Sequence, residues 1–119
     1  MSGLKALIVL SDMRDNGSHH TREEATSQAQ RSAIVIYPIL LGEVQARNGE
    51  VAKLFAGQTG GVPFLIEKGK ALKEAFGSIR ADLDHTYMVA YRPKLKGPNP
   101  IKFRCTRKGT RIFAPDRRF

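Results

Sequence analysis

The chain has 119 residues, which is enough for one domain with a single hydrophobic core and too few for two. Hydrophobic residues make up 41% of it and charged residues 26%, values that are ordinary for globular domains and exclude a wholly disordered chain. The longest apolar run covers residues 33–41, far short of the roughly 20 residues that a membrane helix needs, so we expect no membrane span.

The formal net charge of +9 is concentrated at the C-terminal end. Residues 1–84 hold ten Lys or Arg and ten Asp or Glu, whereas residues 85–119 hold ten Lys or Arg and a single acid, Asp116. This change in composition predicts a main domain over residues 1–84 and a basic extension over residues 85–119 that packs on it. A basic segment can attract nucleic acid, anionic lipid or acidic proteins, or it can be the solvated face of a hairpin.

The single cysteine, Cys105, excludes an intrachain disulfide and a thiolate metal cluster, and we expect it to be a buried, inert thiol. At the N-terminus, the apolar stretch over residues 4–10 is short and contains Lys5, which does not fit a secretory signal.

Signals for a strand, a helix and a second strand follow one another in the first third of the chain. Residues 5–11 form a short apolar run, which predicts a strand buried on both faces, as in parallel sheets. Thr21-Arg-Glu-Glu24 is a capping-box pattern, so a helix is expected over residues 22–32. Its buried side is expected to be a stripe of small residues, Ala25, Ala29 and Ala33.

The second strand is predicted over residues 33–41 and contains a proline. Because Pro38 cannot donate to a ladder, this strand is expected to be kinked, bulged or at an edge for part of its length. A helix over residues 46–58 and a short strand over residues 62–66 follow, separated by the turn Thr59-Gly60-Gly61.

Residues 70–83 predict a third helix, with apolar residues at helical spacing. The alternation of strands and helices indicates βαβ units with right-handed crossovers. The expected fold class is therefore α/β, a three-layer αβα Rossmann-like arrangement of about three parallel strands with helices.

The tail breaks this alternation. Residues 86–92 and 101–106 are typical of strands, and Lys108-Gly109 is expected to turn the chain back into residues 111–114. The resulting hairpin would hold Ile101, Phe103 and Cys105 inward. Its basic face is the candidate partner-binding surface: Lys102, Arg104, Arg107, Lys108 and Arg111.

Several segments resemble, in the same order, the second half of von Willebrand factor A domains of the related bacterial family. They are Lys5-Ala-Leu-Ile-Val-Leu-Ser-Asp12 with the following Asp15-Asn16-Gly17-Ser18, the strand over 33–42, the stretch 54–64 with its Thr-Gly-Gly turn, and residues 87–93. Arg107-Lys-Gly109 and Ile112-Phe-Ala-Pro115 resemble the closing strand of that family, although Thr110 stands where an aromatic residue is usual. The resemblance covers nearly all of the chain, and its specificity lies in the order of the segments.

This resemblance implies a doubly wound sheet that normally carries a metal-ion-dependent adhesion site for Mg²⁺ or Mn²⁺. Of that site only the Asp after the strand has a counterpart here, Asp12, with Asp15 and Ser18 as possible helpers that are also ordinary turn residues. The D-x-S-x-S loop is absent from this chain. We therefore expect no bound cofactor, unless another chain supplies the missing half, and an exposed loop pair at His19-His20 instead of a metal site.

No motif supports catalysis. Gly57-Gln-Thr-Gly60-Gly61 lacks the Lys-Ser/Thr of a phosphate-binding loop, and Ser11-Asp12 has no partnered histidine at a nucleophile elbow. The protein is therefore expected not to be an enzyme.

The leading hypothesis is an adhesion-type protein-interaction module, a truncated von Willebrand factor A-like domain that self-associates as a dimer through residues 5–11 or by exchanging the tail. The alternative is binding of nucleic acid or another polyanion through the basic tail. It is less favoured because the aromatic residues of the tail are expected on the buried face. A third reading is a fragment with no independent function. The resemblance also suggests an exported or cell-envelope protein of a bacterium.

Overall fold

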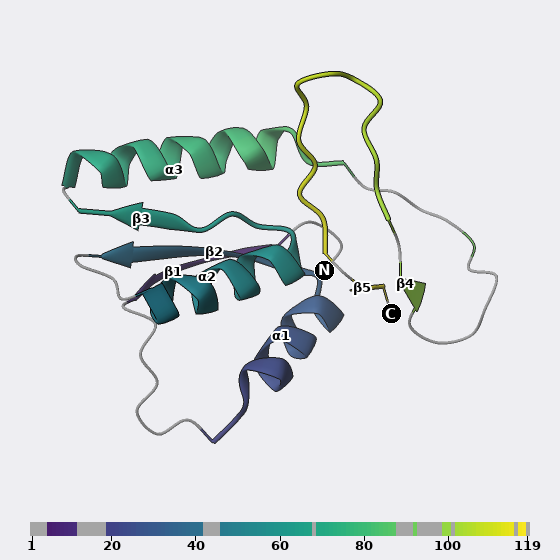
Figure 1. The fold of residues 1–119 in the computed structure, drawn as a ribbon, viewed down its shortest axis with the longest axis horizontal. Coiled ribbons are helices and arrows are strands. Elements are labelled where there is room, and N and C mark those ends of the chain that lie inside the picture. Colours follow the sequence, from purple (N-terminus) through teal and green to yellow (C-terminus); the bar gives the residue numbers. More distant parts are fainter. Residues whose placement is uncertain are drawn as a thin grey trace.

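The computed structural model describes residues 5–11, 19–41, 46–67, 69–87, 92, 99–100, 102–115 and 117–118. Its centre is a parallel sheet of β1 (Lys5–Ser11), β2 (Ile34–Leu41) and β3 (Phe64–Ile66) in the spatial order β1-β2-β3. The strands therefore lie side by side in chain order (Figure 1). The expected α/β class with parallel strands is confirmed.

Three helices cover the sheet. Helices α1 (Arg22–Arg31) and α2 (Ala46–Thr59) lie on one face, and α3 (Gly69–Asp84) lies on the other (Figure 1). Two right-handed crossovers that advance in the same direction put their helices on the same face, so α1 and α2 share a side and contact each other. The chain changes face after β3, which completes the three-layer αβα arrangement.

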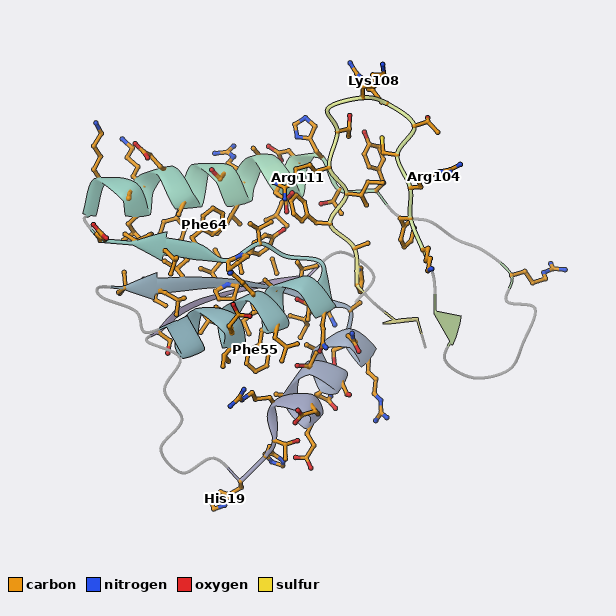
Figure 2. All side chains as sticks on the ribbon, viewed as in Figure 1. His19, Phe55, Phe64, Arg104, Lys108 and Arg111 are labelled. Atoms are coloured by element: carbon orange, nitrogen blue, oxygen red, sulfur yellow. The ribbon has the colours of Figure 1, made fainter. Side chains whose placement is uncertain are left out.

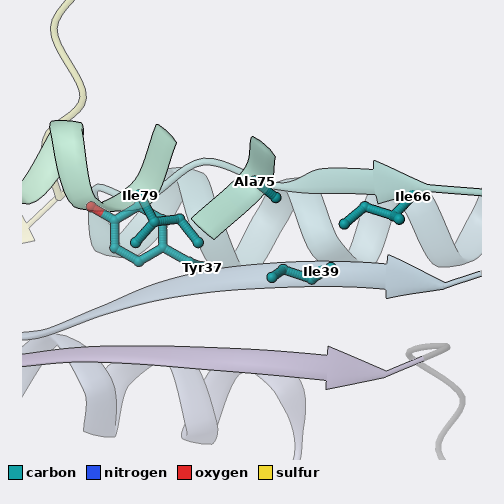
Figure 3. Packing of buried hydrophobic residues seen from close by; sticks show 5 residues of the cluster. All are labelled: Tyr37, Ile39, Ile66, Ala75 and Ile79. Carbon is teal, nitrogen blue, oxygen red and sulfur yellow. The ribbon is translucent and has the colours of Figure 1, made fainter. Parts of the chain in front are cut away.

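The middle strand, β2, is buried on both faces because successive side chains point to opposite sides of a sheet. Tyr37 and Ile39 point toward α3, where they pack with Ile66, Ala75 and Ile79 (Figure 3). On the opposite face the buried residues are Ile36 and Leu40 of β2 with Val51, Ala52 and Ala56 of α2. Both halves of the core therefore depend on the one continuous apolar strand.

Pro38 is fully buried within β2, opposite Val9 of β1. The N–H groups of successive residues in a strand point alternately toward the two neighbouring strands. The Ile36 N–H points away from β1, toward the β3 side, where it donates to the Thr59 hydroxyl. Position 38 faces the same side as position 36, so the N–H that Pro38 lacks would have pointed toward β3. β3 pairs with β2 only from Ile39 onward, so no ladder bond is lost there. The expectation that this strand is at an edge for part of its length is therefore confirmed.

The first helix starts as predicted, but of the predicted buried stripe only Ala29 is buried. Thr21 Oγ1 accepts from the Glu24 amide, and the Glu24 carboxylate accepts from the Thr21 amide, at 3.1 and 3.0 Å. The buried residues are Thr26 and Ala29, whereas Ala25 is exposed. Thr26 is tolerated inside because its hydroxyl donates to the Arg22 carbonyl at 2.8 Å. Ala33 lies beyond the helix, is exposed and has a φ of 55°.

The extension differs from the predicted hairpin. Strands β4 (Asn99–Pro100) and β5 (Arg117–Arg118) pair antiparallel, but the described residues between them, 102–115, form no strand. The expected turn is present, with Gly109 at a φ of 77°. A two-stranded ribbon without a sheet or helix behind it is only marginally stable, which explains the missing ladder. We call residues 102–113 the basic arm.

Two further expectations for the extension are corrected or lie outside the described residues. Cys105 is exposed instead of buried, because its limb of the basic arm has no packed inner face. Phe103 is only partly buried, and Ile101 lies outside the described residues. In the strand expected over 86–92, Thr86, Tyr87 and Arg92 are not in a strand, and the remainder lies outside the described residues.

The turn Thr59-Gly60-Gly61 holds the layers together. Thr59 is 2% exposed; its hydroxyl accepts from the Ile36 amide at 2.9 Å and donates to the Phe55 carbonyl at 2.8 Å. Gly60, with a φ of 92°, and Gly61 both donate to the Ala56 carbonyl, which caps α2 in a left-handed turn. Gly61 also lies directly against the Ile36 carbonyl.

We predict that Gly61→Ala destabilises the protein by about 3 kcal/mol. A Cβ at this position would lie 2.0 Å from the Ile36 carbonyl oxygen, so the turn would have to move away from β2 and give up the bond between Thr59 and Ile36. Urea unfolding followed by circular dichroism measures the loss.

The matched control is Gly57→Ala, within α2, where a Cβ would meet no atom within 4 Å. Because alanine favours the helix, this variant should gain about 1 kcal/mol. Equal stability of Gly61→Ala and the parent chain would show that the turn does not press on β2.

Candidate functional site

The outer edge of β1 exposes two leucine side chains. Among the described residues, no strand pairs with the side of β1 that faces away from β2. Leu7 and Leu10 are 49% and 46% exposed, and the pairing register places them on opposite faces, beside Ile36 and Ile39. The main helix contacts with the sheet are made to β2 and β3, so both faces of β1 remain partly open.

The other edge of the sheet is built differently. β3 has three residues, against seven in β1, and its Leu65 is 67% exposed. A short edge strand offers few unpaired backbone groups to another chain. In β1 the charged residue is Lys5, at the start of the strand, so a long apolar edge is available for pairing.

The five predicted partner-binding residues all lie on the basic arm, and all are exposed. Lys108 is at the tip, with Arg104 and Arg111 on the two limbs (Figure 2). Lys102 and Arg107 lie on the limb that leads to the tip. The described residues 102–115 contain no Asp or Glu, and none of the five cations forms an ion pair with another described residue.

Aromatic and apolar side chains of the extension are exposed as well. Phe113 is 44% exposed and Ile112 is 45% exposed, and Tyr87, after α3, is 85% exposed. The Arg111 guanidinium carbon lies 5.6 Å from the centre of the Phe113 ring, within cation–π range. Nothing in the amino-acid pattern signalled this exposure, since alternation of apolar and polar residues predicts that the apolar side faces inward.

The arm is fixed to the main domain at its base. Pro115 forms an antiparallel bridge with Thr59, and a Cβ on Gly60 would lie 3.1 Å from the Pro115 ring. Helix α1 also contacts β5. These contacts place the base of the arm beside the C-terminal end of α2, close to where the strands begin (Figure 1).

The metal site implied by the family resemblance gains no support from the described residues. Asp12, Asp15 and Ser18 lie outside them, and the described part of the chain contains no group of three or more His, Cys, Asp or Glu side chains that could hold a metal. His19 (Figure 2) and His20 are exposed, and His20 Nδ1 lies 3.2 Å from a Glu24 carboxylate oxygen at the start of α1.

Tyr37 is the ionisable group whose chemistry the fold changes most among the described residues. Burial, followed by the hydrogen bond that its hydroxyl donates to Asp82, raises its pKa well above the ordinary 10.0. Only 2% of Tyr37 is exposed, so solvent and substrates do not reach it. The pair ties β2 to α3 and serves the fold. At the surface, the Thr21 amide and His20 lower the pKa of Glu24.

Together, these features describe an open αβα half-sheet with one long exposed edge and a basic arm at the end where the strands begin. No protein-family model and no curated protein matches the chain. Among solved structures, the chain is similar to an uncharacterized membrane spanning protein from Vibrio fischeri, with a TM-score of 0.55 and 20% identity. The similarity covers 67% of this chain and 48% of that one, so this chain spans about half the length of that structure.

At this level of identity the similarity shows the fold alone. In the described part of the present chain, no helix has the length and apolar character needed to cross a membrane.

We predict that Tyr37→Phe removes a pH dependence of stability. The folded pKa of Tyr37 lies above its unfolded value, so its contribution is complete below pH 10 and is lost as the pH rises above 10. Above pH 10, the free energy of unfolding of the parent chain should fall by about 1.4 kcal/mol per pH unit through this residue. Tyr37→Phe should lack that part of the decline. Below pH 9 the variant should be less stable by about 1 to 2 kcal/mol, because Asp82 loses its donor.

Urea unfolding at pH 8 to 11 makes this comparison, with Tyr87→Phe as the control at an 85% exposed position. Parallel pH profiles for the parent chain and Tyr37→Phe would contradict the prediction.

Proposed function

We propose that this protein is a non-catalytic protein-interaction module, related to half of a von Willebrand factor A-type domain, that self-associates through the outer edge of β1. The observation that carries the proposal is the exposure of Leu7 and Leu10 on opposite faces of a seven-residue edge strand. An edge of this length and composition is a template for pairing with another strand.

Pairing along this edge would stabilise an assembly in two ways. Backbone N–H and C=O groups on the outer side of β1 would gain partners, and the half-exposed leucines would leave water on both faces of the sheet. Fully burying a leucine side chain contributes on the order of 2 kcal/mol relative to leaving it exposed. The edge thus combines backbone complementarity with apolar contact.

A second copy of the chain is the occupant that we propose. The similar solved chain is about twice as long as the part of it that this chain covers, so two copies of the matching region supply a comparable amount of polypeptide. A two-fold axis at Ile8 would pair the two β1 strands antiparallel and place Lys5 opposite the partner's Ser11. Like charges would not meet, and an isologous interface of this kind is the commonest in soluble oligomers.

The resulting assembly would be a continuous six-stranded sheet with a short β3 at each outer edge. The long apolar edge that β1 forms would then lie at the centre. Short edge strands resist further addition, so the assembly would close at two copies.

The test is the molar mass of the purified chain by light scattering on a sizing column at moderate salt, with a reductant present to keep Cys105 reduced. The parent chain should have twice the monomer mass. Leu7→Lys and Leu10→Lys should each weaken the dimer by about 30-fold, corresponding to about 2 kcal/mol, because a charge would be placed in the paired edge.

Leu65→Lys is the matched control. It makes the same chemical change at an exposed leucine of β3, on the other edge of the sheet, and should leave the dimer intact. Equal weakening by all three substitutions would contradict pairing through β1. A monomeric parent chain over the whole concentration range would contradict self-association itself.

A further inference from the structure

The basic arm carries positive charges that no other described residue neutralises by an ion pair. Its cations are Lys102, Arg104, Arg107, Lys108 and Arg111, all exposed, and none forms an ion pair with another described residue. Three of the five are arginines, whose planar guanidinium donates paired hydrogen bonds to phosphate. A patch of this kind attracts polyanions.

One exposed ring beside the cations indicates which class of polyanion the arm can bind. Phe113 is 44% exposed, and the Arg111 guanidinium covers one part of the ring at 5.6 Å from its centre. The main objection to nucleic-acid binding was the expectation that these aromatic residues are buried, and the structure places Phe113 at the surface. Cations alternating with an exposed ring are what single-strand binders use, because every base has a face that can stack.

The way in which the arm is attached to the domain also suits binding of a flexible single strand. The β4–β5 pair and the bridge between Thr59 and Pro115 fix its base, while both limbs project from the domain (Figure 1). A projecting arm can lie along a flexible strand and reach phosphates and bases together.

We infer that the basic arm binds single-stranded nucleic acid, with the cations on phosphates and Phe113 stacked on a base. An anionic membrane is a poorer partner, because surface-bound membrane elements separate their apolar and basic faces, whereas here the two kinds of side chain are interleaved. An acidic protein would use the cations and leave Phe113 unused. A duplex would use the cations alone, since its bases are already stacked. This inference is independent of self-association, since the arm and the β1 edge are different surfaces.

The chain has no tryptophan, so a single introduced indole reports stacking directly. In Phe113→Trp, an unlabelled oligothymidylate of about 16 nucleotides, the upper site size of one single-strand binding unit, should quench the fluorescence. Phe76→Trp is the matched control at 41% exposure on α3 and should show no quenching at the same occupancy.

Charge variants test the phosphate contacts by anisotropy of the labelled oligonucleotide. The triple variant Arg104→Ala, Lys108→Ala and Arg111→Ala should weaken binding at least 10-fold. The control triple Arg22→Ala, Lys73→Ala and Arg80→Ala removes the same charge from exposed helix positions and should change binding less than 3-fold. Removal of each cation that binds a phosphate should reduce the slope of log K against log salt by about 0.7, and the parent slope should be about 3.5 if all five cations bind phosphates.

Four outcomes would overturn the inference. They are an unquenched Phe113→Trp at saturation, equal weakening by the two triple variants, a hairpin duplex that binds as tightly as the single strand, and preferential binding of anionic phospholipid vesicles. Phe113→Leu adds a check that is independent of charge, because loss of a stacked ring should weaken binding by about 5-fold or more at unchanged net charge.

Discussion

The hydroxyl of Thr59 connects parts of the fold that are far apart in sequence. It accepts the Ile36 amide of the central strand and donates to the last turn of α2, and it is buried where no water can replace either partner. The adjoining glycines bring α2, β2 and the base of the basic arm to one point. The same contacts thus join α2 to the sheet and hold the base of the arm.

The helices cover the sheet unevenly. Crossovers concentrate the helices over β2 and β3, and they leave β1, the longer and more apolar edge, only partly covered. A strand that is apolar on both faces is typical of the middle of a parallel sheet. Its position at an edge among the described residues is the physical basis for proposing that another polypeptide completes the sheet.

Local signals were sufficient for the order of the elements in the main domain and insufficient for the extension. They also did not show which sides are covered: β1 was expected to be buried on both faces and is partly exposed, and Ala25 of α1 is exposed. The capping box at Thr21, the apolar run of β2 and the glycine turn after α2 specify their elements through nearby residues, and all three are observed. The alternating pattern after residue 100 predicted a hairpin with buried Cys105. Whether an alternating ribbon forms strands depends on a surface to pack against, which the pattern does not encode. The cations of the arm can be located from the sequence alone. The exposure of Phe113 could not be predicted, because it depends on that same missing packing surface.

The arm leaves the domain close to where the strands begin. In open α/β sheets, ligands usually bind at the opposite, carboxyl end, which in this chain is the end that Asp12 follows in sequence. The seven residues of β1, at about 3.3 Å each, separate the two ends by about 23 Å. A nucleic-acid strand bound by the arm, as we propose, would therefore lie near the beginning of the strands and would not occupy their carboxyl end.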